Sequence, residues 1–156
     1  MKLGFIGTGN MASAIMGGII KKQIIKAEDI IGADLFAPGR ERAKSQFGIH
    51  VTDSNKEVVE KAEVIVLSVK PQFYADVIHE IRGDIRDNQI VITIAPGKTL
   101  AWLAEQFGKE VKLVRTMPNT PAMVGEGMTA ACPNEHMTQE ETAYVRTLLE
   151  SFSRVE

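Results

Sequence analysis

The chain has 156 residues, 44% of them hydrophobic, and a formal net charge of -2. This length suits one domain, and the apolar content is sufficient for a core of ordinary size. Acidic and basic residues are interspersed, which argues against a nucleic-acid-binding protein or a charged interaction tail. Cys132 is the single cysteine, so the sequence excludes an intrachain disulfide and a thiolate metal cluster. We expect this residue to be a small buried hydrophobe.

The first twenty residues contain the most informative motif. A short apolar run, residues 2–6, leads into the segment Gly7–Ala12 and then into an apolar helix predicted to reach about Ile20. In a G-x-G-x-x-A motif the first glycine permits a tight turn, the second lets the backbone approach a pyrophosphate, and the alanine lets the helix pack closely on the strand. The alternative is an ordinary strand-to-helix turn. The strand before it, the helix after it and an acid downstream favour a dinucleotide-binding fingerprint.

The downstream acid is Asp34, which follows the apolar run 30–33 and lies 22 residues after Ala12. At about this spacing a carboxylate accepts hydrogen bonds from the adenosine ribose hydroxyls of a bound dinucleotide. A solvated turn aspartate is the alternative, but the position at a strand end favours the cofactor role. Pro38 and Gly39 then predict a loop, followed by a polar helix from about Arg40 to residue 47.

The remainder of the chain alternates between predicted strands and helices. Strands are predicted at residues 49–52, 64–69, 90–94 and 112–117, with 127–132 as a candidate edge strand. Helices are predicted from a capping box at Ser54 through Lys61, over 73–81, over 100–107 after a Thr99 cap, and after a second capping box at Thr138. The pattern indicates an α/β fold, a Rossmann-like doubly wound, mainly parallel sheet with helices on both faces.

In such a sheet, ligands bind beyond the carboxyl ends of the strands. The ends at residues 68–71, 95–97 and 117–120 consist mainly of small, proline or amide residues, which suit close backbone approach to a nicotinamide and its ribose better than acid–base catalysis. Lys70 is an exception, because its ammonium either meets a ribose or substrate carboxylate or is simply solvated. The three histidines fall on predicted strand, helix and loop, so they favour neither a metal site nor a nucleophile–base pair. The segments at the strand ends are Gly7–Met11, Asp34, Ser68–Pro71, Ala95–Gly97 and Met117–Thr120.

Several segments resemble pyrroline-5-carboxylate reductase, the last enzyme of proline biosynthesis. They are Gly4–Met11, Ser68–Pro71, Ala95–Gly97 and Arg115–Pro121 with its continuation Gly125–Thr129. The Met-Pro-Asn-Thr-Pro segment is the specific part, since many relatives share only the opening. The resemblance implies hydride transfer from NADPH or NADH to the C=N carbon of 1-pyrroline-5-carboxylate, giving L-proline. It implies cofactor contacts at Ile6, Gly7, Thr8, Gly9, Asn10, Met11, Asn55, Ser68, Val69, Lys70, Pro71, Ala95, Pro96 and Gly97.

The substrate side and the choice of cofactor stay open. Met117, Asn119 and Thr120 are candidates to contact the substrate or the nicotinamide, although a proline-stiffened loop that only closes the sheet end is an equal alternative. We identify no catalytic group and no metal site. Asp34 favours a free 2′-hydroxyl, whereas Arg40 and Arg42 favour a 2′-phosphate, so the sequence is compatible with NAD(H) and NADP(H).

Two departures from the resembled family stand out. Ala95-Pro96-Gly97 replaces the usual Ala-Ala-Gly and removes one backbone N–H. Family members also continue into a helical domain that dimerises and supplies most of the substrate site, whereas this sequence ends at Glu156. We therefore expect residues 1–156 to form a dinucleotide-binding domain alone, with catalytic groups outside this chain and a homo-oligomer only when that helical domain is present.

A soluble, cytoplasmic protein is expected, because no apolar run approaches membrane-spanning length. Its partner is expected to be a small-molecule substrate, with no nucleic acid and no membrane. The alternatives to the reductase are a non-catalytic NADP(H)-binding module and a related imine or hydroxyacid reductase.

Overall fold

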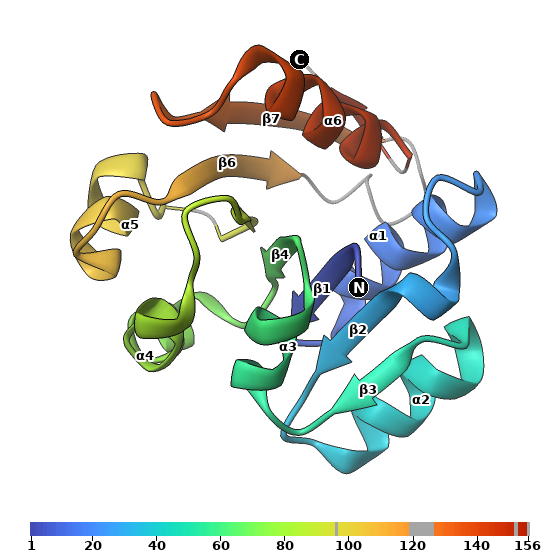
Figure 1. Ribbon diagram of the computed structural model, residues 1–156. Helices are drawn as coiled ribbons and strands as arrows, with labels where there is room; N and C mark the ends of the chain where they lie inside the picture. Colours follow the sequence, from blue (N-terminus) through green and yellow to red (C-terminus); the bar gives the residue numbers. More distant parts are fainter. Residues whose placement is uncertain (96, 119–126, 152, 156) are drawn as a thin grey trace.

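The computed structural model describes residues 1–95, 97–118, 127–151 and 153–155 (Figure 1). Within these residues the strands form one sheet in the order β3-β2-β1-β4-β5-β6-β7-β8, and neighbours from β3 to β6 are parallel. This order is that of the doubly wound dinucleotide-binding fold, so the predicted fold class is confirmed. The strands are β1 Leu3–Ile6, β2 Ile30–Ala33, β3 His50–Thr52, β4 Val64–Leu67, β5 Ile90–Thr93, β6 Lys112–Pro118, β7 Gly127–Pro133 and β8 Ser153–Val155.

Helices cover both faces of the sheet (Figure 1). One apolar cluster joins the sheet to α1 (Asn10–Lys21), α2 (Ala37–Phe47) and α6 (Gln139–Glu150). A second cluster joins the opposite face to α3 (Asn55–Lys61), α4 (Tyr74–Ile81) and α5 (Leu100–Phe107). Three short 3-10 turns, 27–29, 71–73 and 82–84, complete the described helical segments. The two layers leave the carboxyl ends of the strands free to bind a ligand.

The central strands are buried along their whole length, as their continuous apolar runs predict. In β4, Val64 and Val66 belong to the α1 side, while Ile65 and Leu67 belong to the α3 side. This alternation is the two-residue period of a strand that is covered on both faces.

Helix α3 lies directly against the backbone of β1. A Cβ atom added at Gly4 would come within 2.5 Å of Val58 Cγ1 and 2.8 Å of Ala62 Cβ. Glycine at this position therefore allows α3 to approach the sheet closely.

Helix α2 begins earlier than predicted. Pro38 and Gly39, expected in a loop, lie in its first turn, and the Phe36 carbonyl accepts hydrogen bonds from the Gly39 and Arg40 N–H groups. Proline is tolerated there because the first-turn N–H groups of a helix have no intrahelical partner. The helix ends as predicted at Gly48, which has φ 72°.

The predicted N-caps of three helices are confirmed, with one difference. Thr99 and Thr138 cap α5 and α6, and the Thr138 capping box is reciprocal. Ser54 accepts from the Glu57 N–H, but the Glu57 carboxylate accepts from Thr52 and Lys61 instead of returning to the cap. The box at the start of α3 is therefore one-sided.

The end of the sheet that contains β7 and β8 differs most from the sequence-based expectation. β7 is antiparallel to β6, as anticipated, but β8 pairs with its other side, so β7 is an internal strand. Cys132, expected to be buried, is exposed. Its neighbour Ala131 packs against the cluster on the α1 side, so Cys132 points to the opposite face of the sheet.

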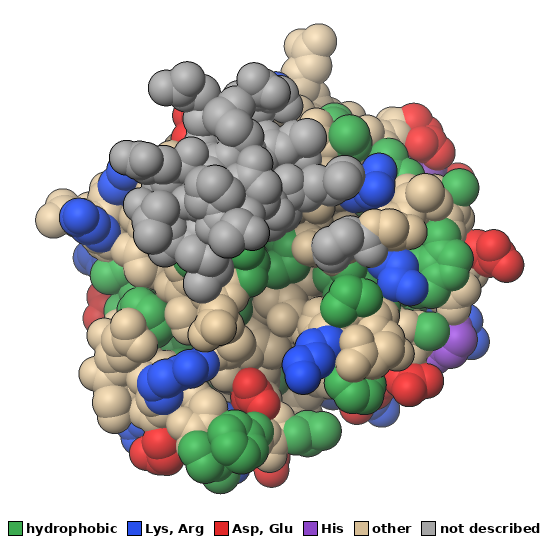
Figure 2. Space-filling model, turned by 180° about the vertical axis from the view of Figure 1, so that it is seen from behind, with side chains coloured by type: hydrophobic (Ala, Val, Ile, Leu, Met, Phe, Trp, Pro, Cys, Tyr) green, Lys and Arg blue, Asp and Glu red, His purple; other side chains and the backbone are tan. Residues whose placement is uncertain are grey.

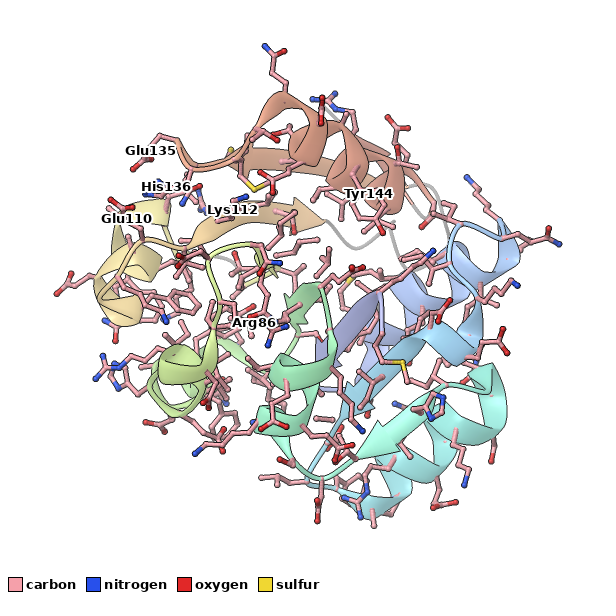
Figure 3. The ribbon with its side chains drawn as sticks, viewed as in Figure 1. Arg86, Glu110, Lys112, Glu135, His136 and Tyr144 are labelled. Carbon is pink, nitrogen blue, oxygen red and sulfur yellow. The ribbon has the colours of Figure 1, made fainter. Side chains whose placement is uncertain are left out.

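An ion pair joins α6 to the start of β6. Lys112 Nζ lies 2.6 Å from Glu141 Oε2, and both side chains are mostly buried. Figure 3 labels Lys112 at this amino-terminal edge of the sheet, with Tyr144 on α6. Partial burial alone would raise the pKa of the Glu141 carboxyl, but hydrogen bonds from Lys112 and Thr138 hold it below its ordinary value.

Replacing Glu141 with glutamine should lower the free energy of unfolding by about 1 kcal/mol near pH 7. Because the pKa is depressed in the folded state, this stabilisation is present above the unfolded-state value near 4.5 and is lost as the pH falls through the folded value. Denaturant unfolding at pH 7 and pH 3 measures the difference, with exposed Glu140→Gln as the matched control. An equal effect at both pH values would contradict the ion-pair account.

Candidate functional site

A cavity of about 680 Å³ opens beyond the carboxyl ends of β1, β2 and β4. Strands β1 and β4 deliver the loop after Ile6 and the turn after Leu67 to this point, and β2 delivers Asp34. The cavity is thus at the place where a doubly wound sheet binds nucleotides. The predicted cofactor residues that line it are Gly7, Thr8, Gly9, Asp34, Asn55, Ser68, Val69 and Lys70.

Other predicted residues lie elsewhere. Ile6 is buried beneath the loop, Met11 packs against the core, and Asn10 lines a separate groove between α1 and α2. Pro71 opens a 3-10 turn, Ala95 is buried, and Gly97 is exposed, all three outside the residues that line the cavity. Met117 belongs to β6. Pro96, Asn119 and Thr120 lie outside the described residues.

The two glycines of the fingerprint serve different purposes. Gly7 has φ 100°, and a Cβ atom there would lie 2.9 Å from the Ser68 carbonyl, so a side chain is excluded by conformation and by contact. At Gly9, in contrast, an added Cβ would meet no atom within 4 Å. Gly9 is also the N-cap of α1, where no side chain caps the helix and the first turn has no acidic residue. The N–H groups there remain available to an anion such as a pyrophosphate.

Asp34 holds the glycine loop in place. Its Oδ2 accepts hydrogen bonds from the Thr8 hydroxyl at 2.6 Å and the Thr8 N–H at 3.2 Å, and its Oδ1 accepts from the Phe36 N–H at 2.9 Å. Partial burial would raise the pKa of the Asp34 carboxyl, but these hydrogen bonds and the nearby Arg40 hold it below its ordinary value. The group is therefore a carboxylate at neutral pH, and it is already bonded to the protein.

Two arginines of α2 donate hydrogen bonds to the glycine loop and to the residue that follows β2. Arg42 Nη2 donates to the Thr8 carbonyl at 2.6 Å, and Arg40 Nη1 donates to the Asp34 carbonyl at 2.7 Å. Each guanidinium has five N–H donors, so further donors remain for a ligand. Positive charge therefore lies beside the end of β2.

Side-chain hydroxyls connect the carboxyl ends of neighbouring strands. Ser68 donates to the Ile6 and Gly7 carbonyls, which ties the end of β4 to the glycine loop. Tyr74 joins the ends of β4 and β5, and Thr116 of β6 donates to the Thr93 carbonyl of β5 at 2.8 Å. These links, with that of Thr8 to Asp34, place the loops of five adjacent strands relative to one another.

Helix α4 supplies cavity residues that sequence reasoning missed. Asp76, Val77 and Glu80 of α4 line the cavity together with Phe73 of the preceding 3-10 turn, and Asn55 Nδ2 donates to Glu80 Oε1 at 2.8 Å. Their spacing of three and four residues is a helix stripe, which was the available signal. Asn55 lies at the start of α3 as predicted, and its side chain is partly exposed.

The surface of the molecule carries mixed charges. Figure 2 shows acidic and basic side chains interspersed over the described part of one face. Within the described ranges, no group of three or more potential metal-ligating side chains comes together. Among the helices described, none is long and apolar enough to cross a membrane.

The fold and this site define a dinucleotide-binding α/β domain. The chain belongs to the family described as "NADP oxidoreductase coenzyme F420-dependent", whose model matches residues 2–97. Pyrroline-5-carboxylate reductase of Escherichia coli (strain K12) is 38% identical over 159 aligned residues, covering 99% of this chain and 58% of the relative. That of Methanosarcina acetivorans is 34% identical, with 99% and 56% coverage. The chain thus spans little more than half the length of these relatives.

Solved structures of pyrroline-5-carboxylate reductases are also similar to this chain. A pyrroline-5-carboxylate reductase from Coxiella burnetii superposes with a TM-score of 0.94 at 29% identity, over 99% of this chain and 57% of that one. The Plasmodium falciparum pyrroline carboxylate reductase with NADP bound has a TM-score of 0.87 at 31% identity, with 100% and 56% coverage. The resemblance inferred from the sequence segments is confirmed.

Proposed function

We propose that residues 1–156 are the dinucleotide-binding domain of a 1-pyrroline-5-carboxylate reductase that uses NADPH or NADH to form L-proline. The observation that carries the proposal is the glycine loop that opens, at Gly9, toward the cavity beyond β1, β2 and β4. Similarity to a pyrroline-5-carboxylate reductase over 99% of the chain supports 1-pyrroline-5-carboxylate as the substrate. A cytoplasmic location belongs to the same proposal and is supported by the single cysteine.

The residues present fit a dinucleotide. The uncapped start of α1 offers N–H groups to the pyrophosphate, and Asp34 lies where an adenosine ribose would be bound. Leu35 and Phe73 offer apolar surface in the same cavity. When bound, the cofactor supplies the hydride. The chain's own residues bind and orient it, and the turns after β4 and β5 form the side on which the nicotinamide would lie.

Reduction of a cyclic imine places few demands on a protein acid. The ring nitrogen is readily protonated, and the resulting iminium carbon accepts hydride when it is held about 3 to 3.5 Å from the donor carbon. Orientation is therefore the main task. We propose that a helical domain like that of these reductases supplies the second wall and the dimer contact, in keeping with the 58% of the relative's length that the chain spans.

The proposal is tested by calorimetric titration of the chain with NADP⁺ and NAD⁺, followed by assay of a form that includes the helical domain. We expect saturable binding of both dinucleotides, and proline formation by the longer form. Reduction of a hydroxyacid substrate in preference to the imine would replace the reductase assignment with a related dehydrogenase. Failure to bind either dinucleotide would refute the site itself.

Asp34 is expected to weaken binding of NADP(H) relative to NAD(H). Among the described residues, four carboxylates line the cavity, at residues 34, 53, 76 and 80, and Lys70 is the one basic residue that lines it. A 2′-phosphate of charge about -1.5 to -2 is repelled by the carboxylate at the end of β2, although Arg40 attracts it. Replacing Asp34 with serine should shift the ratio of the two affinities toward NADP(H) by about tenfold.

The same substitution removes the hydrogen bonds to Thr8, so both affinities should also fall. Asp34→Asn is the matched variant, because it removes the charge but keeps one acceptor oxygen. Calorimetry on both variants separates the two effects. A shift toward NAD(H) would show that Asp34 does not lie beside the ribose.

A further inference from the structure

Tyr74 lies where β4 and β5 diverge. Their parallel ladder ends at the pair Leu67 and Thr93. Just beyond it, the Tyr74 hydroxyl donates a hydrogen bond to the Leu67 carbonyl and accepts one from the Ile94 N–H at 3.2 Å. The side chain is 0% exposed. One phenol oxygen thus bridges two strand ends that no longer bond to each other.

The Tyr74 hydroxyl is suited to hold both groups. Burial raises the pKa of the Tyr74 phenol, against the opposing effect of the Ile94 and Ala95 N–H groups, so the phenol remains protonated at neutral pH. It therefore donates to a carbonyl and accepts from an N–H at the same time. Phenylalanine would fill the same space and leave the two backbone groups without this partner.

The two backbone groups precede the segments that would meet the nicotinamide. The chain leaves β4 at Leu67 into Ser68–Lys70, and it leaves β5 into Ala95. In a doubly wound sheet of this strand order, β1 to β3 bind the adenosine half and the strands on the other side bind the second nucleotide. The adenosine half has its own supports in Asp34 and Asn55, neither of which bonds to Tyr74.

We propose that Tyr74 is a positioning residue for the nicotinamide half of the cofactor, because its hydroxyl sets the separation between the segments that follow β4 and β5. This rests on the proposed function, since it requires a dinucleotide in the crevice. The helix that carries Tyr74 is anchored independently by Ile78 and Ile81, which are both fully buried. Loss of the hydroxyl should therefore alter the strand ends and leave the α4 wall of the cavity in place.

The test compares the whole cofactor with a fragment. Tyr74→Phe is titrated with NADP⁺ and with 2′,5′-ADP, which contains only the adenosine half. We expect the Kd for NADP⁺ to rise about tenfold and that for 2′,5′-ADP to stay within about twofold. Tyr144→Phe is the matched control, because Tyr144 lies on α6 and is 39% exposed, and both of its affinities should be unchanged. A merely structural role of the hydroxyl would weaken both ligands alike.

A second measurement leaves Tyr74 in place. The chain contains two tyrosines, so Tyr144→Phe protein grown with 3-fluorotyrosine carries one fluorine label, at Tyr74. Its ¹⁹F resonance should move on addition of NADP⁺ and stay unchanged with 2′,5′-ADP. This measurement decides the question if Tyr74→Phe fails to fold.

Equal changes with the two ligands, or no change with NADP⁺, would overturn the assignment of Tyr74 while leaving dinucleotide binding intact. Failure of the unmodified chain to bind NADP⁺ would instead refute the proposed function. The two failures are therefore distinguishable in the same titrations.

Discussion

Replacing Gly9 with valine is expected to lower the affinity for NADP⁺ and NAD⁺ by at least about 100-fold while the chain remains folded. A Cβ atom at this position meets no protein atom within 4 Å, and the site has no left-handed backbone requirement. The branched side chain would therefore point into the space that the pyrophosphate needs, at the start of α1. Calorimetry measures the affinity, and circular dichroism confirms the fold.

Gly83→Val is the matched control for this experiment. Gly83 is exposed in the 3-10 turn after α4, and an added Cβ there also meets nothing within 4 Å. This variant should bind both dinucleotides as the unmodified chain does. Undiminished binding by the Gly9 variant would refute the fingerprint interpretation, since the loop would then not contact the phosphates.

The second large effect concerns turnover. The purified 156-residue chain should bind a dinucleotide but reduce 1-pyrroline-5-carboxylate at well below one tenth of the roughly 10 per second of an ordinary enzyme. Among the described residues that line the cavity, Lys70 is the single cation able to hold the substrate carboxylate. It is exposed, and the acidic side chains around it would repel that carboxylate.

Adding the helical domain of the reductases, either fused to the chain or as a separate polypeptide, should restore activity. Stopped assays for proline with a saturating dinucleotide measure both forms. The separate binding titration shows whether an inactive chain is still able to hold its cofactor. Steady turnover by the 156-residue chain at a rate near that of ordinary enzymes would show that the described site needs no second wall.

Local patterns were sufficient to predict most of the fold. Short, mainly apolar runs identified the buried strands, and threonine or serine before a helix identified its start, because both signals depend on neighbours in sequence. The fold class and the glycine loop followed from them. The predicted start of α2, at about Arg40, was wrong because Pro38 is equally compatible with a loop and with a first helical turn.

The parts that were missed depend on contacts between distant residues. That Asp34 meets a ribose stays a prediction, but the hydrogen bonds that it accepts from Thr8, 26 residues earlier, were not foreseen. Nothing near Tyr74 in the sequence indicates that its hydroxyl reaches Ile94. Likewise, the exposure of Cys132 depends on which face of β7 a helix covers, and no local pattern reports that.

The central place of β1 in the sheet affects how the protein folds as it is synthesised. β1 is made before β2 and β4, yet it pairs with β2 on one side and with β4 on the other, so its second neighbour is complete only after Leu67. The Gly7 turn is closed still later by the Ser68 hydroxyl. Contacts across such long stretches of chain form slowly. We therefore expect the nascent chain to gain nucleotide affinity only after residue 68 has left the ribosome, although the glycine loop appears much earlier.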